Sequence, residues 1–305
     1  MASVGGGSSI DTAKVAAEAS LDCDGAECTT IGNELISSDP ARAMLYYRRG
    51  CETGDAVGCS WLGWQYEKGT GVTQNRRRAA ELYAAGCEGG HSEGCNNLGV
   101  LYRNGLGMEQ DFRRAAHFYG RACDLGSVNG CTNLGWLLEF GLGIGADAER
   151  AAKLYRRACD QRDPIACGSL GWLYERGEGL PRDLELATNY YFQACDLGES
   201  VACANVAHTY FFGRGGLAID ETKAVHYARR ACDQDDPWGC TNLARAYRFG
   251  LGGVTRDALR AQAIYIQACN DGDPAGCENL GDMYVDGDVV WSVSKLIRSA
   301  AVGTR

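Results

Sequence analysis

Small, apolar and aromatic residues recur along this chain at the spacing of one face of an α-helix. In one segment they are Cys95, Leu98, Gly99 and Tyr102, at steps i, i+3, i+4 and i+7, and the same set returns in residues 167–174. Charged and polar residues fill the positions between them. This period predicts an amphipathic helix that packs through a narrow stripe of small and apolar side chains.

A second helical pattern follows each of these segments. Ala115, Tyr119 and Cys123 stand four residues apart, after an acidic residue, Asp111, that can cap a helix. Between the two patterns lies a Gly-x-Gly element that begins, in this unit, at Gly105, and glycine suits the left-handed conformation that ends a helix. The whole unit returns after 36 or 37 residues. A period in this range predicts an all-α array of helix-turn-helix repeats.

We expect this array to be a right-handed α/α superhelix of about eight repeats that fills residues 23–288. The glycine- and serine-rich residues 1–9 predict a flexible arm. The alanine-rich residues 10–22 predict an N-terminal capping helix, and residues 289–305 predict a shortened C-terminal capping helix. Both caps would cover an open end of the stacked repeats.

A glycine recurs inside the first helix of the unit, although glycine there costs about 1 kcal/mol relative to alanine. Its recurrence predicts that a neighbouring helix approaches closely at this point. Where glycine is absent, the substitute is alanine, which is also small. The glycines are Gly63, Gly99, Gly135, Gly171 and Gly281, and the alanines are Ala207 and Ala244.

The 16 cysteines all fall into pairs. An even count at regular spacing favours disulfides and an oxidising compartment. A short turn between two helices would also hold cysteines eight positions apart within disulfide reach. Buried free thiols and zinc sites are the alternatives, and zinc usually uses closer pairs. The predicted pairs are Cys23–Cys28, Cys51–Cys59, Cys87–Cys95, Cys123–Cys131, Cys159–Cys167, Cys195–Cys203, Cys232–Cys240 and Cys269–Cys277.

Charge and composition narrow the classes of function. The net charge of −9 argues against a surface for nucleic acid or anionic membrane. The first residues lack the apolar core of a secretory signal and the arginines of a mitochondrial presequence. We identify no convergent catalytic set and no ligand set for a metal or cofactor. Ser292 and Lys295 form an S-x-x-K element of serine hydrolases, but its companion motifs are missing.

The pattern C-x2-L-G-x2-Y-x2-G-x-G, an acidic residue, then A-x3-Y-x3-C resembles the Sel-one-like repeats (SLR), which are relatives of the tetratricopeptide repeats. The version with paired cysteines resembles the Helicobacter cysteine-rich proteins and the mitochondrial SLR-type assembly factor of cytochrome c oxidase. The resemblance covers roughly Cys23–Gly287. It implies a non-catalytic scaffold or adaptor that binds other proteins, because such arrays are adaptors and assembly scaffolds.

Two settings follow from this resemblance. The mitochondrial relative implies an accessory or assembly component of a respiratory-chain complex, facing the intermembrane space. The bacterial relatives imply a secreted or periplasmic protein that binds a peptide or a cell-wall ligand, with weak β-lactam-binding or hydrolysing activity. We expect the first setting and keep the second as the alternative.

The resemblance also implies that the first helix of each repeat lines a concave groove. Two residues after its cysteine, asparagine recurs, and such amides would hold an extended peptide or bond the neighbouring repeat. Five residues after the cysteine the residue varies from aromatic to charged, and these side chains would contact a partner or pack between helices. The candidate partner-binding residues are Trp61, Trp64, Asn97, Asn133, Trp136, Trp172, Asn205, His208, Asn242, Arg245 and Asn279.

Overall fold

A computed structural model describes residues 23–289 of the protein, and every regular element in that range is an α-helix. The predicted all-α fold is therefore confirmed. Most helices are 11 to 13 residues long, and successive helices are joined by short turns or by the glycine-containing loops. The helices are α2 (Gly25–Leu35), α3 (Pro40–Glu52), α4 (Ala56–Lys68), α5 (Arg76–Glu88), α6 (Ser92–Asn104), α7 (Phe112–Asp124), α8 (Val128–Phe140), α9 (Ala148–Cys159), α10 (Pro164–Arg176), α11 (Leu184–Asp196), α12 (Ser200–Phe212), α13 (Glu221–Cys232), α14 (Pro237–Phe249), α15 (Ala258–Asn270) and α16 (Pro274–Val285).

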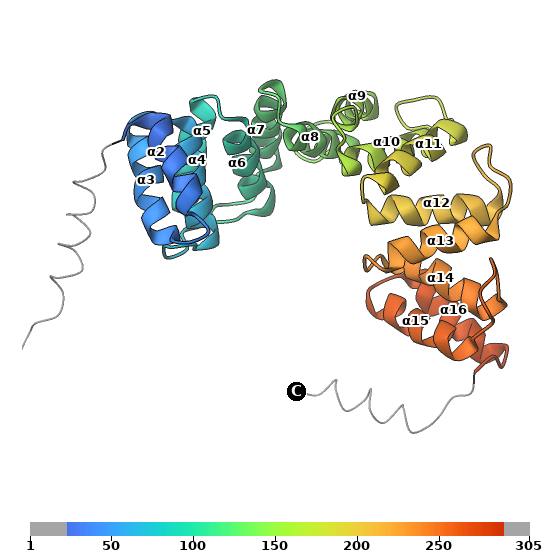
Figure 1. Cartoon of the computed structure of the whole chain (residues 1–305). Coiled ribbons are helices and arrows are strands. Elements are labelled where there is room, and N and C mark those ends of the chain that lie inside the picture. Colours follow the sequence, from blue (N-terminus) through green and yellow to red (C-terminus); the bar gives the residue numbers. More distant parts are fainter. Residues whose placement is uncertain (1–22, 290–305) are drawn as a thin grey trace, which may run out of the picture. The chain divides into compact units, whose positions relative to one another are not determined.

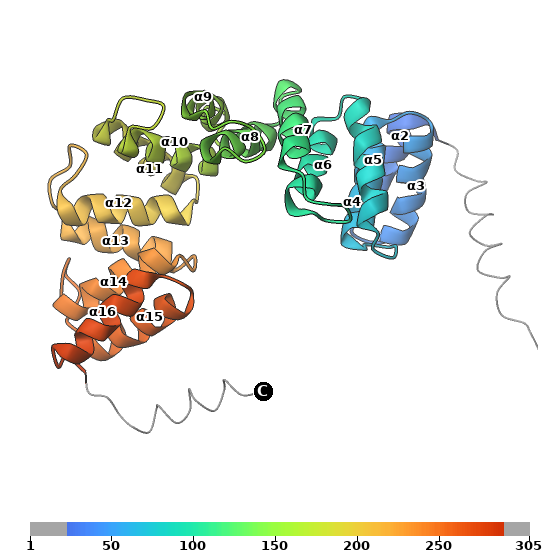
Figure 2. The ribbon, with the colours of Figure 1, turned by 180° about the vertical axis from the view of Figure 1, so that it is seen from behind.

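The described residues divide into two compact units, one ending at Arg157 and the other beginning at Ala158. Within the first unit α2 packs on α3, α4 on α5 and α6 on α7; within the second, α10 packs on α11, α12 on α13 and α14 on α15 (Figures 1 and 2). The first helices of neighbouring repeats also touch, as α12 does with α14. Each unit is thus a stack of helix pairs, as the repeat pattern predicts.

Three predicted segments lie outside the described residues. They are the arm at 1–9, the capping helix at 10–22 and, apart from its first residue, the capping helix at 289–305. The described helices begin with α2 and end with α16, a first helix whose partner helix is not among them. The right-handed sense of the superhelix stays a prediction.

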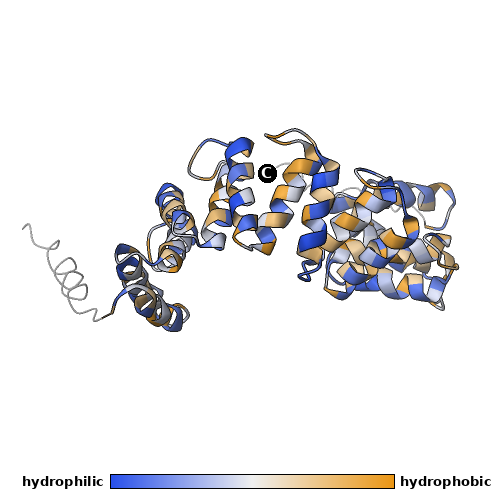
Figure 3. Cartoon of the chain, turned by 90° about the horizontal axis from the view of Figure 1, so that it is seen from above, coloured by the Kyte–Doolittle hydropathy of each residue, from blue (hydrophilic) through white to orange (hydrophobic). Residues whose placement is uncertain are grey.

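Each helix has a buried face and a polar face, and Figure 3 shows hydrophobic and hydrophilic residues interleaved along all of them. The buried residues of one cluster come from α5 and α6 and include Ala79, Tyr83, Leu98 and Leu101. Because each cluster draws on neighbouring helices, a single repeat cannot bury its own core. Stability therefore depends on the interfaces between successive helices.

The glycine of the first helix makes room for the tyrosine of the second. A Cβ atom at Gly99 would stand 2.7 Å from Cδ1 and Cε1 of Tyr119, a fully buried ring. At Gly281 a Cβ would meet no described atom within 4 Å, and the chain beyond residue 289 lies outside the described residues. The predicted close approach is confirmed in the earlier repeats and stays a prediction at Gly281. The other glycine–tyrosine contacts are Gly32–Tyr47, Gly63–Tyr83, Gly135–Tyr155 and Gly171–Tyr191.

The hydroxyl of this buried tyrosine has a partner only where the first helix supplies an acceptor. Tyr83 donates to Glu67 at 2.8 Å, and Tyr191 donates to Glu175 at 2.7 Å. In the α6–α7 pair the same position holds Arg103, and the hydroxyl of Tyr119 has no hydrogen-bond partner. Arginine cannot accept a hydrogen bond. Burial raises the pKa of Tyr119 to about 12, and the positive charge of Arg103 opposes this rise.

Capping groups define the helix ends as the sequence predicts. The Asp111 carboxylate accepts a hydrogen bond from the backbone N–H of Arg114 at 2.9 Å, which satisfies a free donor at the start of α7. At the other end of the first helix, α6 stops at Gly105 with φ of 65°, a left-handed conformation that suits glycine. Asn75 caps α5 in the same way as Asp111, although only acidic caps were expected from the pattern.

Eight disulfides join the predicted cysteine pairs. Seven of them join cysteines that are eight positions apart. Each of these links the end of a second helix to the first turns of the next helix, with Cα atoms 4.4 to 4.7 Å apart. No cysteine is left free. A covalent bond therefore closes every junction between successive repeats, and in the chain-entropy model a loop this short contributes roughly 2–3 kcal/mol.

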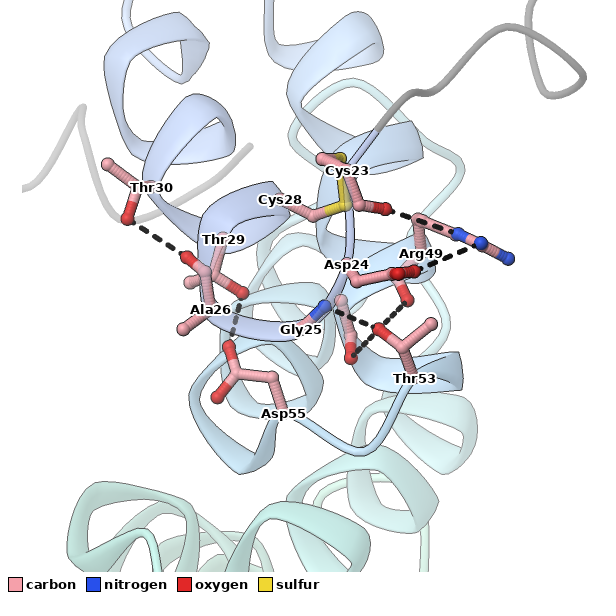
Figure 4. The surroundings of a disulfide bond; sticks show 11 residues. Cys23, Asp24, Gly25, Ala26, Cys28, Thr29, Thr30, Arg49, Thr53 and Asp55 are labelled. Carbon is pink, nitrogen blue, oxygen red and sulfur yellow. Dashed lines mark hydrogen bonds and ion pairs between the residues drawn. A yellow bond between two sulfur atoms is a disulfide. The ribbon is translucent and has the colours of Figure 1, made fainter.

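The eighth disulfide closes the start of α2 instead of a junction. Figure 4 shows Cys23 bonded to Cys28, with Gly25 between them donating its backbone N–H to the hydroxyl of Thr53 at 2.7 Å. The Arg49 guanidinium donates to the carbonyl of Cys23 at 3.4 Å. Since Thr53 and Arg49 belong to the end of α3, these bonds tie the first helix to the second at the N-terminal edge.

A buried arginine closes the other edge. Arg248 of α14 lies within 2.6 Å of the Asp286 carboxylate and donates to Asp288 at 2.8 Å, and Asp288 also pairs with Arg256 at 2.6 Å. The hydrogen bond from Arg248 lowers the pKa of Asp288. These carboxylates follow α16 directly, where the earlier repeats have their glycine loop. The sequence pattern did not indicate this ion-pair network.

We expect Gly99→Ala to destabilise the protein by about 1–3 kcal/mol, because the new methyl group overlaps the buried ring of Tyr119. Gly281→Ala is the matched control at the same position of the last described repeat. There the new methyl group meets no atom of residues 23–289 within 4 Å, so removing a helical glycine should raise stability by up to about 1 kcal/mol. Denaturant unfolding of both variants gives the two values. Equal effects of the same sign would contradict the role of the tyrosine contact.

We expect Asp288→Asn to weaken α16 by about 1–3 kcal/mol, since Arg248 loses a charged partner while buried. The folded pKa of Asp288 lies below its ordinary value of 3.8, so its contribution is complete above that pH and disappears as the pH falls through the folded pKa. Amide hydrogen exchange in α16 between about pH 5 and pH 2 should show this loss in the natural protein and not in Asp288→Asn. Asp271→Asn, at an exposed position, should retain it.

Candidate protein-binding surface

Two of the four predicted tryptophans are part of the packing between helices. Trp61 stacks on the buried ring of Tyr47 with centroids 5.9 Å apart, and Trp64 meets Trp61 edge-on at 5.9 Å. Both are half-buried and pack against the apolar clusters of the first three helix pairs. These contacts favour the alternative of burial over partner contact for Trp61 and Trp64.

The other two tryptophans are exposed. Trp136 on α8 has an exposed fraction of 37%, and Trp172 on α10 has 41%. The Trp136 ring lies 5.5 Å from Phe140 and carries the Arg103 guanidinium 5.7 Å from its centroid, while Arg176 lies 5.1 Å from the centroid of Trp172. Both rings thus stay partly exposed beside a cation. Such rings are suited to a partner's apolar or cationic side chain.

One asparagine of the predicted ladder bonds the neighbouring repeat. The Asn133 Nδ2 donates to Oδ1 of Asn96 at 3.0 Å, and Arg103 donates to Oδ1 of Asn133 at 3.3 Å. This is the structural alternative considered for these amides. Asn97, half-buried beside them on α6, is close enough to accept a hydrogen bond from Asn96 at 3.4 Å.

The asparagines of the second unit are also engaged within the chain. Asn205 donates to the carbonyl of Val201 at 3.1 Å, and Asn279 donates to that of Ala275 at 2.7 Å, each within its own helix. Asn242 has an exposed fraction of only 5%, and its Nδ2 finds no hydrogen-bond partner. The amides therefore do not form a uniform row of free donors and acceptors.

The two remaining candidates, His208 and Arg245, lie near one another in the second unit. His208 is 4.6 Å from Phe212 and 5.3 Å from Trp238, and the Arg245 guanidinium lies 4.9 Å from the centroid of Phe212. Burial lowers the pKa of His208, and the positive charges of Arg214 and Arg245 lower it further. The structure thus brings these two sequence-predicted residues together around a ring that the sequence analysis did not select.

That ring belongs to a position the sequence analysis missed. Phe140, Phe212 and Phe249 each stand nine residues after the cysteine of their first helix, and Phe140 and Phe249 are 57% and 53% exposed. The signal was available, because each lies four residues beyond a selected position and so on the same helix face. With these rings included, the surface stays aromatic in the second unit. The predicted change from aromatic to charged side chains is incomplete.

A groove of about 760 Å³ lies between α5 and α7 in the first unit and is lined by Arg77, Tyr102, Arg114 and Phe118. Similar open grooves lie beside the Gly71 loop and along α7 and α15. Their repetition makes them a consequence of the helix stacking.

Within residues 23–289 no group of three metal-ligating side chains comes together, and no helix is long and apolar enough to cross a membrane.

Comparison with known proteins agrees with this architecture. No curated protein matches the chain. A family model described as Sel1 repeat matches almost all of the described range. It matches residues 26–55, 56–91, 92–127, 128–163, 164–199, 200–236 and 239–273.

Several solved structures resemble the chain. A protective antigen of uropathogenic Escherichia coli with an SLR fold is 24% identical over 85% of this chain, with a TM-score of 0.72, and the match spans 56% of that protein. A Sel1 repeat protein from Oxalobacter formigenes is 23% identical over 79% of this chain and 96% of its own, with a TM-score of 0.73. The cysteine rich protein B of Helicobacter pylori is 30% identical over 44% of this chain and 97% of its own, with a TM-score of 0.37.

We expect Asn133→Ala to lower the free energy of unfolding by about 1 kcal/mol or more, because it leaves Asn96 and Arg103 without a shared partner. Asn205→Ala is the control, since Asn205 bonds only its own helix. Thermal and denaturant unfolding would show a clear difference between the two variants. If both variants unfold like the natural protein, the hydrogen bond between the repeats contributes nothing to stability.

Proposed function

The chain belongs to the Sel1 repeat family, and we propose that it is a non-catalytic protein-binding scaffold that uses the exposed face of its first helices. Sel1 repeat proteins are protein-binding scaffolds. The observation that carries the proposal is the exposed aromatic pair of α8, Trp136 and Phe140, together with Trp172 of α10. Single exposed apolar residues are ordinary, but here they return at fixed positions of a repeat. Large aromatic rings are frequent anchors of protein interfaces.

The disulfides support this role by holding the surface in shape. Each junction between repeats is closed by one of them, and the helices on both sides pack through buried tyrosine and leucine side chains. A partner that binds such a surface orders few groups on the scaffold when it docks. The entropic cost of association is correspondingly smaller.

We infer an oxidising compartment from the eight disulfides and the absence of any free cysteine. Within that class, the mitochondrial intermembrane space and a role beside a respiratory-chain complex rest on the sequence resemblance alone. The relatives of known structure described above come from bacteria. The secreted or periplasmic setting therefore stands beside the mitochondrial one.

The proposal that the scaffold is non-catalytic rests on the structural use of its polar side chains. Several polar side chains of the described first helices take part in tyrosine bonds and in junctions between repeats, as Glu67 and Asn133 do. The S-x-x-K pair that suggested weak β-lactam chemistry, Ser292 and Lys295, lies outside the described residues. The binding role needs neither residue.

We expect Trp136→Ala and Trp172→Ala each to weaken capture of the native partner by about tenfold or more, as loss of an interface anchor does. Leu259→Ala, at an exposed position on α15, is the control and should leave capture unchanged. The measurement is quantitative mass spectrometry of proteins cross-linked to the full chain in its native source. A partner set that is the same for all three variants would remove the first-helix face as the binding surface.

A further inference from the structure

The second unit carries a cluster of aromatic rings and guanidinium groups on the neighbouring helices α12 and α14 and the loop after α12. We call it the aromatic–arginine cluster, and its members are His208, Phe212, Arg214, Trp238 and Arg245. The Phe212 ring is its centre, with the guanidinium carbons of Arg214 and Arg245 at 5.7 and 4.9 Å from its centroid. His208 fills the space between Phe212 and Trp238, at 4.6 and 5.3 Å from their centroids.

The two arginines have no negative partner. Neither Arg214 nor Arg245 forms an ion pair or a side-chain hydrogen bond with any residue of the range 23–289. Other arginines in the same unit are paired: Arg176 bonds Glu178, and Arg248 bonds two aspartates. In a chain with a net charge of −9, two unpaired guanidinium groups on one ring are an unusual concentration of positive charge.

This positive charge contributes to the lowered pKa of the neighbouring His208. After burial, which is the largest cause, Arg214 and Arg245 both lower the pKa of His208, and Glu175 opposes them only in part. Both guanidinium groups place positive charge beside the same ring. A carboxylate that binds there would form charge-assisted hydrogen bonds with them.

Apolar surface adjoins the positive charge. Phe212 is itself exposed, and so are Val201 near the start of α12 and Phe249 at the end of α14. Val201 and Phe212 are spaced to lie on one face of α12, as Arg245 and Phe249 are on α14, and the two helices are in contact. A ligand that matches the face has a negative group with an apolar group next to it.

We propose that the aromatic–arginine cluster binds a peptide segment of a partner protein in which an acidic side chain stands next to an apolar one. The proposal rests on the scaffold function above and specifies the chemistry of its partner. The chain's own residues 290–305 are a poor occupant, since they include Lys295, Arg298 and Arg305 and no acidic residue. Nucleic acid is disfavoured because two arginines in an acidic protein make a weak phosphate surface.

The test is selection of a displayed library of random twelve-residue peptides on the full chain, followed by affinity measurement of the enriched peptides. We expect enrichment of aspartate or glutamate beside an aromatic or aliphatic residue. Substituting both arginines (R214Q and R245Q together) should weaken binding of these peptides by about tenfold or more, because charge-assisted hydrogen bonds are lost. Arg260→Gln is the control, since this arginine stacks on Tyr247 from α15, outside the cluster.

Several results would overturn the proposal. They are enrichment of neutral or basic peptides, no enrichment, equal binding by the double variant, or stronger competition by a single-stranded oligonucleotide than by the acidic peptide. Competition by a synthetic peptide of residues 1–22 would assign the cluster to the chain itself, and dimerisation in sedimentation that the acidic peptide reverses would assign it to a second copy. Circular dichroism of the double variant, which changes two surface side chains, would verify its fold.

The scaffold function can be judged separately. If partner capture depends on Trp172 but not on Arg214 and Arg245, the scaffold stands and the acidic-peptide proposal fails. If capture depends on none of them, the scaffold proposal fails first.

Discussion

A buried tyrosine ring of the second helix lies against a glycine of the first in several successive repeats, and this contact sets how closely each pair of helices can approach. Gly99 and Tyr119 show the constraint, since even one added methyl group would overlap the ring. The close approach leaves no room for a longer side chain at the glycine position. Variation in size and charge is therefore found at other positions of that helix.

The tyrosine hydroxyl links this packing to the outer surface. Where the first helix offers a glutamate, such as Glu67 or Glu175, the hydroxyl is satisfied and the carboxylate is used inside the repeat. Where the first helix has an arginine at this position, the hydroxyl has no hydrogen-bond partner among the described residues and the guanidinium contacts other groups. Arg103 then supports the exposed Trp136, and Arg248 closes the last described repeat through Asp288. This one position of the first helix thus accepts the tyrosine hydrogen bond in some repeats, supports an exposed ring in another, and closes the last described repeat.

The binding surface we infer depends on these same choices. The first helices bury their small residues and leave aromatic rings outside, and disulfides hold neighbouring repeats together. In the second unit, two arginines that have no acidic partner among residues 23–289 lie beside the ring of Phe212. A scaffold of this kind recognises its partner through the few positions that differ between repeats. The core residues that the repeats share are buried between helices and cannot contact a partner.

The sequence by itself determined the helices, their caps and the cysteine pairs, since these depend on contacts between residues close in the chain: Asp111 caps three residues on, and Cys123 meets Cys131 across one turn. Only the tertiary structure decided which outer residues are accessible. Trp64 and Trp136 occupy the same position of the repeat, yet Trp64 packs against Trp61 and the α5–α6 cluster while Trp136 stays exposed. Accessibility depends on side chains from neighbouring repeats, and a pattern within one repeat does not contain them.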